Sequence, residues 1–347
     1  MTVAREQDPH AWQRILADER ARAAIERVWA CSEFVAAACE RSPALLGELV
    51  DSGNLFTRSA QGAFAEQISA QVTGASDAQL MESLRRFRKR HMVRIAWRDI
   101  AGWADLDETL RDLSALADAS IELAYRRMYD ALIARYGVPR GVENSSVQPM
   151  MIIAMGKLGG RELNFSSDID LILLYPEEGE TDSTRSIDNA EFFLRLGQKI
   201  VQLLATPTVE GFVYRVDLRL RPFGDSGRLA LGFGAFEHYL QQHGRDWERY
   251  AYVKARPLTA VDEYAALYQE VLRPFVYRRY LDFGVFESLR DMKAMIAREV
   301  ERRELQDDIK LGPGGIREIE FIVQAFQLIR GGSDPRLQSR ELRTVLP

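Results

Sequence analysis

The chain has 347 residues, and 46% of them are hydrophobic, which is enough for two or three domains with apolar cores. A formal net charge of -5 argues against a general nucleic-acid-binding protein, because such proteins usually carry a basic excess. The two cysteines, Cys31 and Cys39, match no zinc or redox spacing and indicate a reducing compartment. The charged amino terminus lacks the apolar segment of a signal peptide, and no apolar run is long enough to cross a bilayer. We therefore expect a cytoplasmic protein without nucleic-acid or membrane partners.

Residues 1–140 have the periodicity of helices. The stretch 77–102 places four apolar residues near one face: Leu80, Leu84, Phe87 and Met92. The stretch 106–137 carries a second stripe: Leu106, Leu110, Leu113, Leu116 and Ala117. Gly137 and Pro139 predict the end of that helix, and residues 138–149 have the composition of a linker.

The pattern changes at Met150 and predicts a mixed α/β domain over residues 147–260. "MMIIAM" and "DIDLILLY" are typical of buried strands, and residues 189–206 have helical periodicity with Asp188 as the N-cap. "FVYRVDLRLR" (212–221) alternates apolar and polar residues, which predicts a half-buried strand. Helices return over 262–347, where Gly331 and Gly332 end the last long one, and the abrupt end at "LRTVLP" indicates a piece of a longer protein.

Two aspartates mark the strand after the glycine-rich turn "GKLGG". Asp168 and Asp170 are two residues apart, so in a strand their side chains lie on one face, about 7 Å apart. Like charges at that separation repel unless a cation lies between them, and Mg²⁺ prefers one or two carboxylates with waters and substrate phosphates. Two solvated acids on an edge strand are the plainer alternative.

Three further features favour a phosphoryl or nucleotidyl transfer site. The glycines allow backbone amides to approach a phosphate. Asp217 lies on the polar face of another expected strand and adds a third carboxylate if the strands pair. That face also carries Arg215, Arg219 and Arg221, and guanidinium groups bind phosphate oxygens. The four histidines have no metal-ligand spacing and are expected mostly at the surface, and the chain contains neither a P-loop nor a Gly-x-Ser-x-Gly sequence.

The ordered segments "GKLGGREL…SSDIDLI", "YRVDLRLRPFGDSG", "GRDWERYAYVKAR" and "KLGPGGIREIEFIVQ", within residues 145–335, closely resemble the glutamine-synthetase adenylyltransferase family. The resemblance implies an α+β fold, with a polymerase-β-like nucleotidyltransferase domain of mixed sheet and helices between helical regions. Family members carry two such units in tandem: the first removes AMP from glutamine synthetase and the second adds it. "ELNFSSDID" and "GPGGIREIEF" are more similar to the first unit.

By this resemblance, Asp168, Asp170 and Asp217 are the catalytic and metal-binding acids, with Mg²⁺ or Mn²⁺ as the metal. Gly159 and Gly160 would line the nucleotide phosphate, and we also expect Lys157, Ser167, Arg219 and Arg221 to bind the AMP/ADP moiety or inorganic phosphate. Trp247, Glu248 and Lys254 match later motifs without an assigned role, and Trp247 is expected in the core because large aromatic side chains usually are buried.

The resemblance implies phosphorolysis of the adenylyl-tyrosine bond, which gives ADP and unmodified glutamine synthetase, under control of a PII-type nitrogen-signal protein. The alternatives are the AMP-adding unit, another nucleotidyltransferase with the same fold that modifies a small molecule or an RNA end, and a non-catalytic helical regulatory module.

Overall fold

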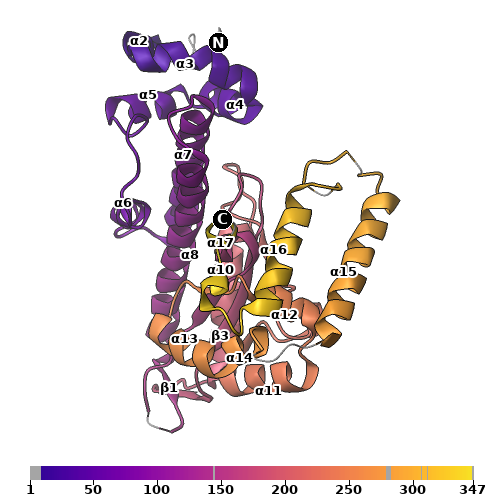
Figure 1. Ribbon diagram of the computed structural model, residues 1–347. Coiled ribbons are helices and arrows are strands. Elements are labelled where there is room, and N and C mark those ends of the chain that lie inside the picture. The colour runs from indigo at the N-terminus through magenta and orange to yellow at the C-terminus, as the bar shows by residue number, and fades with distance from the viewer. Residues whose placement is uncertain (1–8, 144, 279–282, 306, 311, 346–347) are drawn as a thin grey trace. The chain divides into compact units, whose positions relative to one another are not determined.

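The computed structural model describes residues 9–143, 145–278, 283–305, 307–310 and 312–345 (Figure 1). The first eight residues, on which the absence of a signal peptide partly depends, lie outside these ranges. The chain divides into two compact units, one comprising the described residues of Met1–Arg126 with Glu162–Ser167 and Val201–Arg215, and the other comprising the rest. The chain therefore passes between the units within helices as well as loops. The predicted domain limits near 140 and 262 stay predictions.

The first unit is helical. Its helices are α2 (Pro9–Ala17), α3 (Glu19–Cys31), α4 (Glu33–Arg41), α5 (Pro43–Asp51), α6 (Ala63–Gln71), α7 (Asp77–Ile100) and the first part of α8 (Leu106–Tyr136). The two long helices predicted from the apolar periodicity are confirmed. Ser76 begins α7 with a capping box, since its hydroxyl accepts from the Gln79 amide while the Gln79 side chain accepts from the Ser76 amide.

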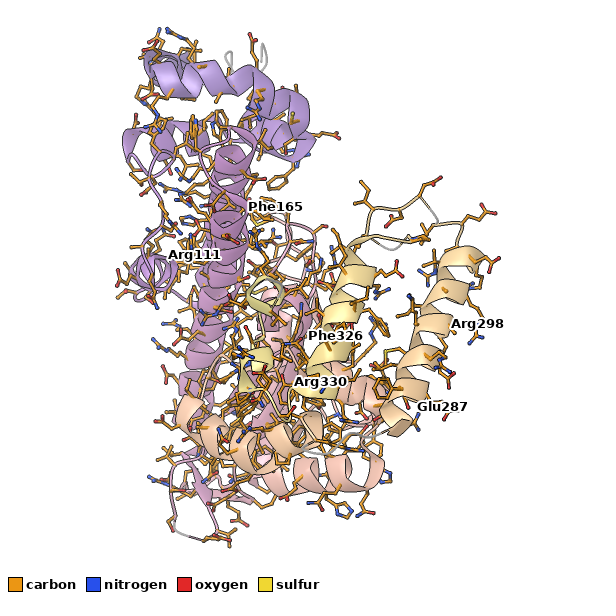
Figure 2. The ribbon with its side chains drawn as sticks, in the orientation of Figure 1. Arg111, Phe165, Glu287, Arg298, Phe326 and Arg330 are labelled. Atoms are coloured by element: carbon orange, nitrogen blue, oxygen red, sulfur yellow. The ribbon has the colours of Figure 1, made fainter. Side chains whose placement is uncertain are left out.

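The core of the first unit forms where the short helices α2 to α5 pack on the carboxyl-terminal half of α7 (Figure 1). Trp97 is fully buried there, and Phe165, labelled in Figure 2, packs against the same cluster. The four apolar residues predicted to line α7 are buried. In the α8 stripe, Leu110 is half-buried and Leu106 is 54% exposed, the latter because it is the first residue of the helix.

Buried ion pairs join α7 to α8 within the first unit. Arg94 Nη1 lies 3.0 Å from Asp112 Oδ2, and Arg98 Nη2 lies 2.8 Å from Glu108 Oε1. Removing one partner of such a pair leaves a buried charge uncompensated, so these pairs fix how α7 packs on α8.

His91 is buried, although histidines were expected mostly at the surface; His10, His238 and His243 are exposed, as expected. The ring of His91 packs against Phe64 and Phe87. Burial, together with the positive charges of Arg94 and Arg90, lowers the pKa of His91 to about 3.

The second unit is built on a mixed sheet with β3 (Ile169–Tyr175) at its centre. One edge of β3 pairs antiparallel with β2 (Met151–Ala154), which pairs in turn with β7 (Arg256–Pro257). The other edge pairs in parallel, first with β5 (Val216–Asp217) and then with β6 (Ala230–Gly232). The strands predicted at "MMIIAM" and "DIDLILLY" are thus confirmed, and their side chains are almost all buried.

Two local predictions are wrong. The expected linker 138–149 contains a strand, β1 (Pro139–Gly141), which pairs with β4 (Gly179–Thr181). The expected strand 212–221 is extended and paired only at Val216–Asp217. The reason is that the adjacent amides of Val213 and Tyr214 both donate to the carbonyl of Leu204, so both residues turn inward and the alternation breaks.

Further helices lie between and after these strands in the chain. They are α9 (Gly156–Gly159), α10 (Asn189–Ala205), α11 (Phe233–His243), α12 (Asp246–Tyr252), α13 (Val261–Leu267), α14 (Arg273–Val276), α15 (Phe283–Arg302), α16 (Ile316–Arg330) and α17 (Leu342–Val345). The short helical segments are η1 (Gly224–Ser226), η2 (Tyr268–Leu272) and η3 (Pro335–Gln338). Asp188 accepts from the Glu191 amide and caps α10, and Gly331 follows the end of α16, both as predicted.

The helices α15 and α16 run alongside each other (Figure 1), and a cavity of about 310 Å³ lies between them. Glu287 and Arg298 on α15, and Phe326 on α16, are exposed (Figure 2). None of the described helices is long and apolar enough to cross a membrane. The fold is α+β with helical flanks, as predicted.

The pKa of His91 predicts how stability depends on pH. Its folded-state pKa lies below the usual value of about 6.5, so its stabilising contribution is complete above pH 6.5 and is lost as pH falls toward 3. We expect His91→Leu to flatten the fall in the free energy of unfolding between pH 6 and 4, by up to about 1.4 kcal/mol per pH unit. Urea unfolding at several pH values measures this. His10→Gln, at an exposed position, is the control, and an unchanged slope in His91→Leu would contradict the prediction.

Candidate functional site

Two carboxylates meet where β3 begins. Asp170, the second residue of β3, and Asp217, the last residue of β5, are direct partners in the parallel register of the two strands. Asp168 lies one residue before β3 and is exposed, whereas Asp170 is half-buried. The structure therefore brings Asp217 to the Asp168/Asp170 segment even though the strand that carries it is only two residues long.

The surroundings of Asp170 oppose its ionisation. Burial is the main cause, and the negative charges of Asp217 and Asp168 add to it, so that the pKa of Asp170 is raised to about 6. Arg219 acts in the opposite direction. A carboxyl group held in this way gains from any cation that approaches it.

Arg219 is the counterion of Asp217. Its Nε lies 2.9 Å from Oδ2 and 3.1 Å from Oδ1, and its backbone amide donates to Oδ1 at 2.9 Å. These hydrogen bonds lower the pKa of Asp217, while burial works against them. The Arg219 side chain is 72% exposed, so solvent and solutes reach its outer face.

Arg221 has a different environment from Arg219. Its guanidinium donates to the carbonyls of Leu218 at 2.8 Å, Asp225 at 3.2 Å and Gly227 at 3.4 Å, and its side chain is only 12% exposed. These bonds close the loop 218–227. The expected phosphate-binding role of Arg221 stays a prediction, and in this structure its donors hold the loop together.

The glycine turn α9 lies against Asp170. Gly156 has φ +53°, and a Cβ at this position would lie 2.7 Å from Asp170 Oδ2, so a side chain is excluded on two grounds. Gly159 and Gly160 are buried, and their amides donate to the carbonyls of Met155 and Gly156 within the turn. The glycines thus have a packing role here; their contact with a nucleotide phosphate stays a prediction.

The remaining predicted residues are divided between the units. Lys157, in α9, is half-buried and belongs to the second unit. Ser167 and Arg215 belong to the first unit, where Arg215 Nη2 donates to the carbonyl of Ser166 at 2.8 Å.

In the motif "GRDWERYAYVKAR", which follows α11, the buried residue is not the one that was predicted. Trp247 is 41% exposed, so the expectation that it lies in the core is wrong. The buried residue is its neighbour Glu248, which accepts from the Tyr239 hydroxyl at 2.7 Å and from the Arg245 amide at 2.9 Å. The Glu248 carboxylate can be buried because these two hydrogen bonds satisfy it, and it is this side chain, not the Trp247 indole, that holds the motif in the core.

Lys254 and Arg256 are also buried, and Lys254 Nζ lies 3.7 Å from Glu320 Oε1. Arg256 was not among the residues predicted for the site. Its only sequence signal was its place in "GRDWERYAYVKAR", because a lone arginine after a helix is ordinarily solvent-exposed.

The donor chemistry of the acids suits a hard divalent cation. Asp168 and Asp170 offer carboxylate oxygens, and Mg²⁺ binds through one or two carboxylates plus water and substrate phosphates. Among the residues that the structure describes, no three His, Cys, Asp or Glu side chains are grouped closely enough to hold a metal ion by themselves. Magnesium stays a prediction, and the register pairing of Asp170 with Asp217, which helps to raise the pKa of Asp170, is in its favour.

Comparisons with known proteins identify relatives over the part of the chain that carries these residues. The family model described as glutamate-ammonia ligase adenylyltransferase matches residues 22–271, and the model for GlnD PII-uridylyltransferase matches residues 290–345. Among curated proteins, the bifunctional glutamine synthetase adenylyltransferase/adenylyl-removing enzyme of Thioalkalivibrio sulfidiphilus is 54% identical over 324 residues, which is 93% of this chain and 33% of the relative. The enzymes of the same name from Nitrosococcus oceani and Pseudomonas aeruginosa are each 52% identical, over 92% and 93% of this chain and 33% of each relative.

The chain thus spans about a third of the length of the curated relatives that it matches. The first family match covers both the glycine turn and the acids on β3 and β5. The chain belongs to the glutamate-ammonia ligase adenylyltransferase family.

Proposed function

We propose that this chain is a nucleotidyltransferase unit that removes AMP from adenylylated glutamine synthetase, with inorganic phosphate as the acceptor. The relatives' name covers both adding and removing AMP, and the family match spans the acid cluster. The observation that carries the proposal is the register pairing of Asp170 with Asp217 beside an exposed arginine and a glycine turn. Removal rather than addition rests on the similarity of "ELNFSSDID" and "GPGGIREIEF" to the first unit of the family.

In this reaction a phosphate oxygen attacks the phosphorus of the adenylyl group, and the bond from phosphorus to the tyrosine oxygen breaks. The products are ADP and tyrosinate, which takes a proton from solvent. Phosphate is already an anion, so its attack needs no strong base, and the barrier is largely repulsion between negative groups. Arg219 is placed to reduce that repulsion, because its charge lies beside the acids and faces solvent.

Asp168 and Asp170 would hold a divalent cation, and Asp217 would add a third carboxylate if it gave up its hydrogen bonds with Arg219. When bound, such an ion supplies charge neutralisation at the adenylyl oxygens and assists a leaving group whose free pKa is about 10. Gly156 itself places no side chain in the space next to Asp170.

Control by a PII-type signal protein is part of the proposal. It is supported by the match of residues 290–345, which include the larger part of α15 and all of α16, to a family named for PII uridylylation. A non-catalytic module is disfavoured. Holding Asp170 beside two other acids costs electrostatic free energy, and a module without catalysis would gain nothing from it.

The first prediction tests the acids by activity. Asp170→Asn should abolish phosphate-dependent release of ADP from adenylylated glutamine synthetase, because an amide cannot hold a cation in place of a carboxylate. The assay follows labelled AMP groups in the presence of Mg²⁺ and phosphate. Near-normal turnover in the variant would reject the metal role. Transfer of label from ATP to unmodified glutamine synthetase by the wild-type chain would instead identify the AMP-adding activity.

A second prediction concerns stability without metal. The pKa of Asp170 is raised from 3.8 to about 6, so its ionisation costs stability: the cost is absent below pH 3.8 and complete above pH 6. In EDTA at pH 8, Asp170→Asn should therefore raise the free energy of unfolding by about 1–3 kcal/mol. The gain should shrink as pH falls through 6 and vanish near pH 4. Urea unfolding measures it, and Asp168→Asn, at an exposed position, should give a smaller gain. A destabilised Asp170→Asn protein at pH 8 would contradict this account.

A third prediction concerns the exposed arginine. Arg219→Ala should raise the KM for phosphate by about 3- to 10-fold, with little change in the KM for adenylylated glutamine synthetase. The chain offers a matched control: Arg336 makes the same kind of fork on Asp334, with its Nε 2.9 Å from Oδ1 and its backbone amide 3.1 Å from Oδ1. Arg336→Ala should leave both constants unchanged. The anion-binding role fails if phosphate titrations of Arg219→Ala and the wild-type chain coincide.

A further inference from the structure

The segment Lys254–Arg256 lies against the carboxyl-terminal end of the glycine turn α9. A Cβ on Gly159 would lie 1.9 Å from the carbonyl oxygen of Lys254, so the two backbones are in close contact. The Arg256 guanidinium, which is buried, donates from Nε to the carbonyl of Gly159 at 3.2 Å and from Nη2 to the carbonyl of Leu158 at 2.9 Å. One short segment thus holds the end of the turn by its backbone and by a side chain.

The other end of the turn meets Asp170. A Cβ on Gly156 would lie 2.7 Å from Asp170 Oδ2, and the amide of Met155, just before the turn, donates to the carbonyl of Asp170 at 2.9 Å. The turn is only four residues long, and the amides of Gly159 and Gly160 bond back to its beginning. Displacing one end therefore displaces the end that touches Asp170.

Arg256 is itself anchored in the sheet. It begins β7 and is the register partner of Ala154, the last residue of β2. A buried guanidinium costs desolvation free energy, and an apolar side chain would fill the same space at less cost. What an apolar side chain cannot do is donate two hydrogen bonds in a fixed fork to consecutive carbonyls.

We propose that Arg256 is a positioning residue of the acid site: it holds the glycine turn at the place beside Asp170 that the adenylyl chemistry requires. The proposal rests on the proposed function. Arg256 touches no reacting atom, and it acts through Leu158 and Gly159 on the turn.

The test is Arg256→Lys, which keeps the charge and replaces the planar fork by a point donor. Hydrogen exchange of the Gly159 and Gly160 amides should become faster, because the turn opens more often. The kcat for ADP release should fall by about 10- to 100-fold, as for other residues that orient a catalytic group, while both KM values change by less than about twofold.

The matched control is Arg249→Lys. Arg249 is also buried and makes the same kind of fork, from Nε to the carbonyl of Phe275 at 3.0 Å and from Nη2 to the carbonyl of Val276 at 3.3 Å, in addition to an ion pair with Asp246. This variant should lose comparable thermal stability but keep the exchange of the turn amides and the kcat. An equal fall in kcat in both variants would mean general destabilisation and would overturn the proposal, as would unchanged exchange at Gly159 and Gly160 in Arg256→Lys.

Two further arms keep the outcome decisive. If Arg256→Lys does not fold, as judged by circular dichroism, Arg256→Gln takes its place with the same criteria. If the wild-type chain releases no ADP, the proposed function fails, and the positioning role is then judged by Mn²⁺ affinity measured by electron paramagnetic resonance. A lower affinity in the Arg256 variant but not in Arg249→Lys supports the role, and equal affinities in the variant and the wild-type chain overturn it.

Discussion

The pairing of β3 with β5 places two carboxylates side by side, and the chemistry proposed for the second unit depends on this constraint. Asp170 and Asp217 are register partners, so neither can move away without breaking the strand pair. Asp170 responds with a raised pKa, and Asp217 responds by binding Arg219. Two neighbouring acids thus have opposite pKa shifts, which is the pattern expected where a site is prepared for a cation and an anion together.

The pairing of β3 within the sheet offsets the free energy of the repulsion between these acids. β3 is buried along its length after Asp170 and pairs on both edges, with β2 on one side and with β5 and β6 on the other. The repulsion is therefore confined to the one end of the strand that faces solvent. The stability of the remaining, fully paired part of β3 holds the acids together, in the manner usual for strained functional sites.

The sequence predicted those features that depend on local pattern. The strands around Ile152 and Ile172 and the helix capped by Asp188 follow from short apolar runs and a capping residue, which need no knowledge of distant segments. Asp217 was assigned to the site on the condition that its strand paired with the first, and that condition is met. The prediction of a strand over 212–221 was wrong because the Leu204 carbonyl accepts hydrogen bonds from the amides of Val213 and Tyr214. The alternation of apolar and polar residues does not reveal such a tertiary contact. The expectation for Trp247 was wrong, and Arg256 was not singled out, for a related reason: composition alone cannot tell which polar side chain finds buried partners.

The two arginine forks show why local sequence could not define the site by itself. Asp217 with Arg219 and Asp334 with Arg336 have the same spacing and nearly the same hydrogen bonds. Only the first fork lies beside another acid, Asp170, and only there does the guanidinium act on a second carboxylate. An anion that drew Arg219 away from Asp217 would leave two adjacent negative groups, which would raise the affinity for a divalent cation at the same place. In the proposed function, anion and cation binding would thus be coupled by electrostatics, and that coupling would come from the neighbouring strand rather than from the Asp-x-Arg sequence.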